Sequence, residues 1–258
     1  MISAVTGFLE KFGEGLLFTA RILKLCLAGK VSYEGLFDQI WKVFKESLPT
    51  TMVAGFFVGA IMTVQFSLQI APFGALGYLG GLATSATIRE VGPLLIAFLL
   101  SGKIGAFTAA ELGTMKVTEQ IDAIRCLGSD PLTEVIAPRF MGIIVASLFL
   151  LVFGLILSVA GGLLMGALFS GINAQEYLRH IPTLISSLSV FTGLIKCLCF
   201  SFVIASVCTY LGHQTTGGAR GVGQSVIHTA VFSMVSIVVA DWLSSFILDS
   251  LLRSAGLL

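Results

Sequence analysis

Charged residues are scarce in this 258-residue sequence: they make up 11% of the chain, whereas hydrophobic residues make up 56%. Soluble domains carry about 25% charged residues, so the composition excludes an ordinary soluble fold and indicates an integral membrane protein. The formal net charge is +1, and the sequence has no cluster of Lys or Arg. The charge pattern therefore argues against a nucleic acid as a partner.

The sequence also lacks the motifs of disulfide, metal and nucleotide sites. Its five cysteines have no Cys-x-x-Cys spacing, and its three histidines have no acidic or cysteine partner at metal-site spacing. We interpret these residues as packing or surface groups, and expect no metal, cofactor or catalytic residue in this chain. No Walker A motif is present, so ATP would have to be hydrolysed by another chain. The N-terminus lacks the pattern of a cleaved signal peptide.

The first 47 residues are amphipathic rather than continuously apolar. Leu16, Leu23 and Leu27 recur at helical spacing, while Glu14 and Arg21 occupy other faces. A second apolar stripe at helical spacing runs over 33–48 and leads through a proline into the first span. The pattern predicts N-terminal interfacial, elbow-like helices over 1–47, followed by a transmembrane domain over 48–258.

Long, predominantly apolar runs place the membrane spans. A span needs about 20 apolar residues, and the sequence satisfies this requirement five times. The expected spans cover about 49–70, 88–115, 140–175, 184–212 and 222–249. The sequence therefore predicts an all-α integral membrane protein with five transmembrane helices. Lys and Arg are concentrated in the N-terminal region and in the connections after the second and fourth spans, which predicts a cytoplasmic N-terminus and an external C-terminus.

Several charges interrupt these spans. Each costs about 2.5–3.5 kcal/mol on insertion scales unless it is paired or faces a polar cavity, so all of them are functional candidates. Arg89 and Glu90 also fit a simpler interpretation, because Thr87-x-x-Glu90 has the pattern of a capping box at a helix start. Lys196 lies in mid-span, where it must pair with a carboxylate or face a polar ligand. Candidate partners are Glu90, Glu111 and Asp241.

The connection over 114–131 is too polar to span a membrane but keeps an apolar side. Val117, Ile121 and Ile124 form that side, Gly128 is suited to a helix C-terminus, and Asp130-Pro131 prevents the helix from continuing. Such a segment can dock in a groove of a soluble partner and transmit motion to the adjacent spans. The alternative is a plain interfacial connector.

Several strings in this region resemble the MlaE/YrbE family of permeases, the membrane subunits of ABC lipid transporters associated with MCE proteins. The resembling residues are Arg89-Glu90-Val91-Gly92-Pro93, Ala110-Glu111-Leu112-Gly113, Thr118 to Ala123, Gly128 with Asp130-Pro131, and Pro138-Arg139. The resemblance implies a homodimer that carries two cytoplasmic ATPases, with 114–131 as a coupling helix and a lipid cavity between the protomers.

The resemblance also implies roles for individual residues. Arg89 and Lys196 would contact a lipid headgroup, with Glu90 orienting Arg89, because a forked guanidinium is suited to phosphate. Met62, Ile70 and Phe73 would line the acyl-chain region. Contacts to the ATPase would come from Glu119, Gln120, Asp122, Arg125, Gly128, Asp130 and Pro131.

The expected function is that of a permease subunit in an ATP-driven transporter. It would move phospholipid or a similar lipid between the bacterial inner membrane and a periplasmic MCE-type carrier, and so contribute to lipid homeostasis of the outer membrane. Two alternatives remain open. A secondary transporter or channel would use Lys103, Glu111, Lys196 and Asp241 as an ion path, and a membrane scaffold would use every charge for packing.

Overall fold

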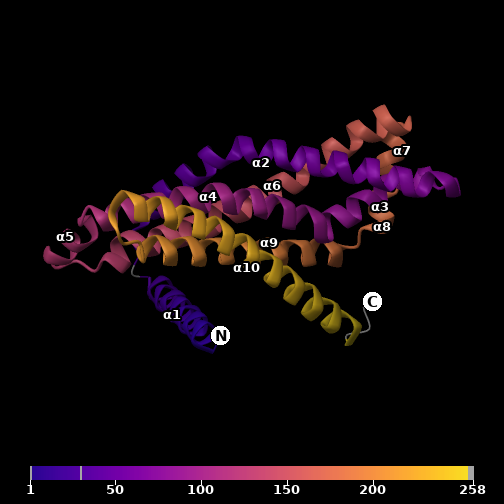
Figure 1. The fold of residues 1–258 in the computed structure, drawn as a ribbon. Helices are drawn as coiled ribbons and strands as arrows, with labels where there is room; N and C mark the ends of the chain where they lie inside the picture. The colour runs from indigo at the N-terminus through magenta and orange to yellow at the C-terminus, as the bar shows by residue number, and fades with distance from the viewer. Residues whose placement is uncertain (1, 30, 255–258) are drawn as a thin grey trace. The chain divides into compact units, whose positions relative to one another are not determined.

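A computed structural model describes residues 2–29 and 31–254, and within them every regular element is a helix (Figure 1). The α-helices are α1 (Ile2–Leu27), α2 (Tyr33–Ile70), α3 (Leu79–Ala86), α4 (Gly92–Val117), α5 (Gln120–Cys126), α6 (Ala137–Ser170), α7 (Ala174–Arg179), α8 (Ile181–Leu184), α9 (Ser187–His213) and α10 (Gly218–Ser254). Two 3₁₀ turns, Ala71–Phe73 and Leu76–Tyr78, and two π-helical segments, Thr87–Val91 and Leu132–Ile136, complete the described chain.

Within the described residues, five helical segments are long and apolar enough to cross a membrane, which agrees with the five predicted spans. They are Tyr33–Phe73, Leu76–Val117, Leu132–Ser170, Ser187–His213 and Gly218–Ser254. Four of them are longer than the expected spans, whereas Ser187–His213, with 27 residues, is slightly shorter than the expected 184–212.

Helix α2 runs without interruption through the expected boundary between residues 47 and 48. Pro49 lies inside the helix, where its missing N–H leaves one carbonyl without an intrahelical donor. In this turn the Thr51 hydroxyl donates to the Ser47 carbonyl at 2.9 Å. The segment over 33–48 is thus continuous with the first candidate span in one helix.

The second candidate span begins earlier than expected and contains a π turn. Helix α3 passes into the π segment Thr87–Val91, which passes directly into α4. The Thr87 hydroxyl donates to the Ala83 carbonyl one turn back, at 2.7 Å. Thr87 therefore lies in mid-helix, and the interpretation of Thr87-x-x-Glu90 as a capping box is wrong.

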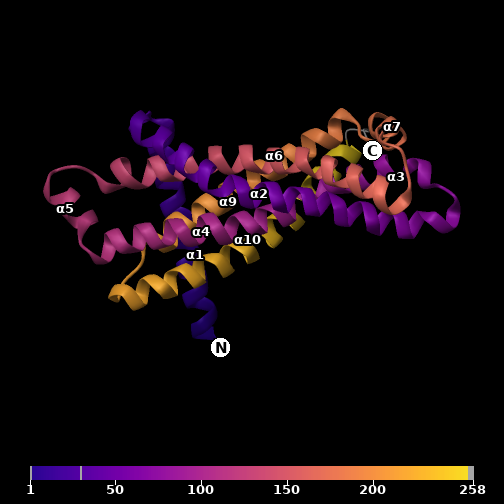
Figure 2. The ribbon, with the colours of Figure 1, turned by 90° about the horizontal axis from the view of Figure 1, so that it is seen from above.

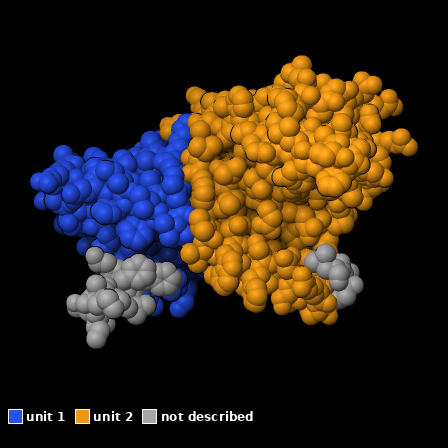
Figure 3. Space-filling model, turned by 45° about the vertical axis from the view of Figure 1, so that its right-hand side comes forward, with its two compact units in different colours: residues 1–44, 101–146, 202–236 blue, residues 45–100, 147–201, 237–258 orange. Residues whose placement is uncertain are grey.

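The described chain forms two compact units, coloured separately in Figure 3. One unit comprises 1–44, 101–146 and 202–236, and the other comprises 45–100, 147–201 and 237–258. We call them the first and the second unit.

Glycines bring α2 and α6 into backbone contact within the second unit. A Cβ added to Gly55 would overlap the backbone of Gly154, and one added to Gly59 would overlap the carbonyl of Ser158. From the other side, a Cβ on Gly161 would overlap the carbonyl of Phe56. Small residues allow this close approach, which van der Waals packing stabilises in a membrane.

Tyr177 anchors the short helix α7 against α3 in the same unit, and both views of the ribbon show these helices side by side (Figures 1 and 2). Its side chain is 2% exposed, and its hydroxyl lies 3.0 Å from the Thr63 hydroxyl of α2. Gly80 and Gly162 leave space for this ring and its backbone. The anchor fixes the connection between α6 and α9, and α9 carries Lys196.

In the first unit, Glu111 of α4 joins three helices. Its carboxylate pairs with Lys42 of α2 and with Arg139 of α6, 3.7 Å away, and the Lys42 ammonium also lies 4.6 Å from the centre of the Phe107 ring. The side chain of Arg139 is only 12% exposed. Glu111 therefore has a structural role, because opposite charges reduce the penalty for placing each in an apolar bundle.

Candidate functional site

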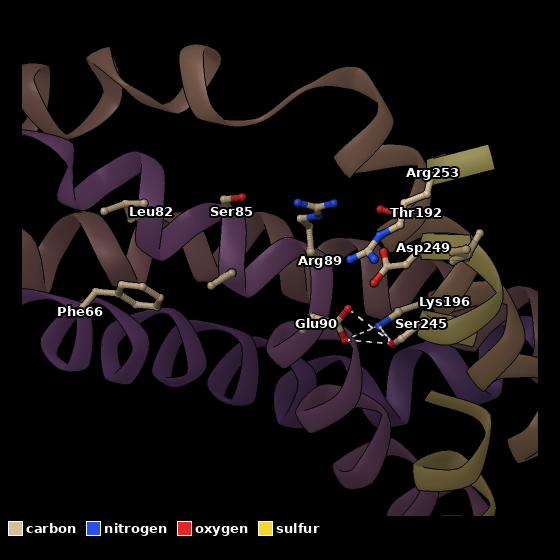
Figure 4. Close-up of a pocket in the computed structure, with 12 residues that line it drawn as sticks. Phe66, Leu82, Ser85, Arg89, Glu90, Thr192, Lys196, Ser245, Asp249 and Arg253 are labelled. Carbon is tan, nitrogen blue, oxygen red and sulfur yellow. Dashed lines mark hydrogen bonds and ion pairs between the residues drawn. The ribbon is translucent and has the colours of Figure 1, made fainter. Parts of the chain in front are cut away.

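A cavity of about 790 Å³ lies within the second unit (Figure 4). Its lining residues come from α2, from α3 and the π segment, and from α9 and α10. They are Phe66, Leu82, Ser85, Ala86, Arg89, Glu90, Thr192, Lys196, Ser245, Leu248, Asp249 and Arg253. Ionised and apolar side chains thus line one hollow in a helical membrane protein.

The π segment supplies the first two charges. A π turn widens the helix by one residue, and such turns are frequent at functional sites. Here Arg89 and Glu90 lie in the turn, and both line the cavity. Figure 4 shows the Glu90 carboxylate directed toward Lys196 and Ser245, while the Arg89 guanidinium points away from that group. The two neighbouring residues therefore have separate surroundings.

Lys196 is buried in an ion cluster formed by three parts of the chain. Its side chain is 2% exposed, and its ammonium pairs with Glu90 of the π segment and with Asp241 of α10, whose Oδ1 is 3.0 Å away. It also donates to the Ser245 hydroxyl at 2.7 Å. The predicted ion-pair alternative for Lys196 is thus formed, with Glu90 and Asp241 as its partners.

This cluster changes the expected role of Glu90. The Glu90 carboxylate pairs with Lys196 and lies 3.4 Å from the Ser245 hydroxyl. Among the described residues, no ion pair joins it to Arg89. Glu90 therefore connects the π segment to α9 and α10, in place of the predicted contact that would orient Arg89.

Asp249 and Arg253 are charged residues of the cavity that the sequence analysis did not identify. Both lie near the end of α10 and line the cavity with Ser245, four residues earlier. Residues four apart share one face of a helix, so 245, 249 and 253 form a single polar row. The four-residue spacing could have identified this polar row from the sequence. The two charges were not singled out because they lie at or beyond the expected end of the fifth span.

The predicted acyl-chain residues lie beside the cavity lining rather than in it. Phe66 is the cavity residue of α2, and Met62 and Ile70 lie one turn before and after it on the same face. Ile70 packs against the cluster of Leu79, Ile172 and Tyr177. Phe73 lies in the 3₁₀ turn after α2 and is 83% exposed.

The predicted coupling segment contains the short helix α5 in the first unit. Its entry is tight, since Glu119 has a φ of 62°, the left-handed region that non-glycine residues rarely adopt. Ile121 is fully buried and attaches the helix to its unit. Asp122 lies 3.2 Å from the Lys116 ammonium of α4 and 3.6 Å from the Arg125 guanidinium. Asp122 therefore holds α5 against the end of α4.

The turn after α5 also follows the sequence prediction. Gly128 has a φ of 83°, as expected of a residue just after a helix. Asp130 accepts hydrogen bonds from the Leu132 backbone N–H and the Thr133 hydroxyl, each at 3.1 Å, and so caps the next helical segment. Glu119, Gln120, Arg125, Gly128 and Asp130 are exposed, whereas Pro131 is buried. The exposed part is a polar surface, to which Leu127, 85% exposed, adds an apolar side chain that the sequence analysis did not single out.

Comparison with known proteins identifies the family. The model of the family described as permease MlaE matches residues 36–247 of this chain. The chain belongs to the MlaE permease family. The match covers both the cavity residues up to Ser245 and the whole of the α5 segment.

The bacterial relatives of this MlaE-family chain are described as probable ABC transporter permeases. One from Synechocystis is 31% identical over 230 residues, which are 89% of this chain and 88% of the relative. One from Rickettsia prowazekii is 33% identical over 198 residues, 77% of this chain and 76% of the relative. The Arabidopsis thaliana chloroplast protein TRIGALACTOSYLDIACYLGLYCEROL 1 is 31% identical over 231 residues, 89% of this chain and 66% of that protein. The MlaE-family chain is thus a multi-pass permease subunit of an ABC transporter.

Proposed function

We propose that this permease binds a phospholipid, or a similar lipid, in the cavity of the second unit and moves it in response to ATP hydrolysis by a partner. The observation that carries this proposal is the mixed lining of the cavity. Phe66, Leu82 and Leu248 offer an apolar wall, whereas Arg89 offers a guanidinium without an ion pair to another described residue. An amphiphile satisfies both, because an anionic headgroup needs a charged partner and its acyl chains need only an apolar wall.

The volume of the cavity and the name of one relative both support a lipid as the substrate. Ligand cavities range over about 300–1,000 Å³, and this cavity has about 790 Å³. The name of the related chloroplast protein contains that of a glycolipid. In contrast, the charges that an ion path would use are engaged in pairs: Lys196 with Asp241, and Glu111 with Lys42.

We further propose that α5 and its flanking turns form the docking surface for a cytoplasmic ABC ATPase, which binds and hydrolyses the ATP. The segment is short, charged and exposed on one side, while buried Ile121 and paired Asp122 attach it to its unit. Such a rigid attachment allows force applied to the exposed side to reach α4.

The assembly that we propose is a homodimer with two ATPases and a periplasmic MCE-domain protein, in the bacterial inner membrane. The N-terminus would be cytoplasmic, and lipid would pass between this membrane and the MCE carrier. Helix α10 favours the dimer: only 11% of its most apolar stretch is buried, against 44–50% in the other four candidate spans. Its exposed side chains include Val235, Trp242 and Phe246, which leaves a face for a second copy.

Lipid retention tests the proposal. The full chain, purified with its ATPase in detergent, would be assayed for bound phospholipid by mass spectrometry and for lipid transfer after reconstitution. Arg89→Ala should reduce both while the ATPase remains bound. The matched control is Arg179→Ala, which removes an exposed arginine of α7 outside the cavity and should change neither. Equal retention and transfer by wild type and Arg89→Ala would exclude the cavity as the lipid site.

A further inference from the structure

We propose that the cavity prefers a zwitterionic phospholipid headgroup to an anionic one, with the phosphate at Arg89 and the ammonium at Asp249. The inference rests on the proposed lipid-binding function and specifies its substrate class. It follows from which charges of the cavity are already paired and which remain open to a ligand.

The first step removes Lys196 from the set of headgroup ligands. A lysine ammonium has three N–H donors. The acceptors within hydrogen-bond reach are also three: Glu90, Asp241 Oδ1 at 3.0 Å and Ser245 Oγ at 2.7 Å. No donor of Lys196 remains for a phosphate, and its 2% exposure leaves little room for one. The phosphate partner therefore has to be one of the cavity's arginines.

The second step is the charge balance of the cavity. The cluster of Lys196, Glu90 and Asp241 carries a formal charge of −1. The other ionised residues of the lining, Arg89, Asp249 and Arg253, carry a formal charge of +1. The described charges of the site therefore balance. A zwitterionic headgroup preserves this balance, whereas an anionic headgroup leaves one uncompensated negative charge beside the carboxylates of the site, which is unfavourable because like charges repel.

The third step places the ammonium. Asp249 lines the cavity, is exposed and has no ion pair with another described residue. Glu90, the other carboxylate of the lining, is already engaged by Lys196. When the phosphate of a headgroup binds Arg89, the ammonium of the same headgroup can therefore pair with the Asp249 carboxylate. Thr192 and Ser245 supply hydroxyl groups in the same lining.

The test is a competition between two headgroups. The full chain with its ATPase would be equilibrated in detergent micelles that contain equal amounts of phosphatidylethanolamine and phosphatidylglycerol with identical acyl chains. After repurification, mass spectrometry would give the ratio of the two lipids retained, with Arg89→Ala as the baseline for lipid bound outside the cavity. Wild type should retain the ethanolamine lipid in about fivefold excess, the ratio that corresponds to about 1 kcal/mol for one partly exposed ion pair.

Two variants should move this ratio in opposite directions. Asp249→Asn should bring it close to one, because the ammonium loses its acceptor. Arg253→Gln should raise it, because the cavity becomes more negative. The control is Glu176→Gln, which removes an exposed carboxylate of α7 that does not line the cavity and should leave the ratio unchanged.

The outcomes separate the two proposals. If the wild type retains lipid above the Arg89→Ala baseline but with a ratio near one, or with a ratio that Asp249→Asn does not alter, the headgroup inference is overturned and lipid binding stands. If the wild type retains no lipid above that baseline, the proposed function fails, and the headgroup inference fails with it.

Discussion

Replacing Lys196 with methionine should destabilise the permease by breaking the ion cluster of the second unit. Methionine keeps an unbranched apolar chain of similar length but removes the ammonium that pairs with Glu90 and Asp241. Removing one partner of a buried ion pair costs about 3–5 kcal/mol, since it leaves the other charge unpaired. The side chain of Glu90 is 51% exposed and can rehydrate, while that of Asp241 is 18% exposed. We therefore expect the lower end, about 3 kcal/mol in the free energy of unfolding.

The control for this prediction is the neutralised cluster, Lys196→Met with Glu90→Gln and Asp241→Asn. Breaking a buried ion cluster is costly because it leaves a charge unpaired. The triple variant leaves no charge unpaired, so it should recover most of the lost stability. Unfolding of the detergent-solubilised protein by denaturant titration, followed by tryptophan fluorescence, gives both values. If Lys196→Met unfolds at the wild-type midpoint, or if the triple variant is no more stable than the single one, the cluster does not hold the three segments together.

The same variants separate a structural role of Lys196 from direct lipid contact. A triple variant that is stable and retains phospholipid assigns Lys196 to the framework of the cavity. One that is stable but retains none would show that the ammonium contacts the headgroup, contrary to the saturation of its three donors.

Three further predictions concern other parts of the chain. Asp122→Asn should lower ATPase-coupled lipid transfer while changing the free energy of unfolding by less than about 1 kcal/mol, because its pairs with Lys116 and Arg125 are partly exposed; unaltered coupling in a transfer assay would contradict this role. Gly59→Ala should destabilise the protein by about 1–3 kcal/mol through its clash with Ser158, whereas Gly13→Ala, with open space around it, should not; equal denaturation midpoints for the two variants would refute the close packing of α2 and α6. A reporter fused after residue 258 should register outside the cytoplasm, because five spans would follow the proposed cytoplasmic N-terminus; cytoplasmic activity of the fusion would refute that topology.

The number of spans was predictable because a membrane imposes a simple length requirement. Predominantly apolar runs long enough to cross the apolar core give five candidates, three of which contain charges, and the described residues form five. The ends of the spans were less predictable, since charged helical turns continue past the apolar runs. Pro49 illustrates the difficulty: it fits a boundary in the sequence, yet it lies inside α2. Backbone groups in an apolar medium must be satisfied within the helix, which favours continuation over a break.

The sequence predicts which charged residues belong to the candidate site, but it does not predict which of them form ion pairs with one another. Charges in an apolar run identify Arg89, Glu90 and Lys196 whatever the fold, because each requires a partner or a polar cavity. Their pairing depends on the π turn at Thr87–Val91, and the pattern that precedes it also fits a helix cap. Asp249 has no such signal, since a charge near the end of a span is typical of an ordinary interface.

The two cations predicted to hold a headgroup differ in one physical respect, which is whether their donors are already used. Lys196 is 2% exposed and has an acceptor for each N–H. Arg89 has five N–H donors, lines the same cavity, and forms no ion pair with another described residue. The Lys196 ammonium, whose N–H donors are all used, stabilises the site but gains no hydrogen bond from a ligand. The unpaired Arg89 guanidinium forms its ion pair only when an anionic ligand binds. Ligand binding should therefore depend on Arg89, and the shape of the cavity that presents Arg89 should depend on Lys196.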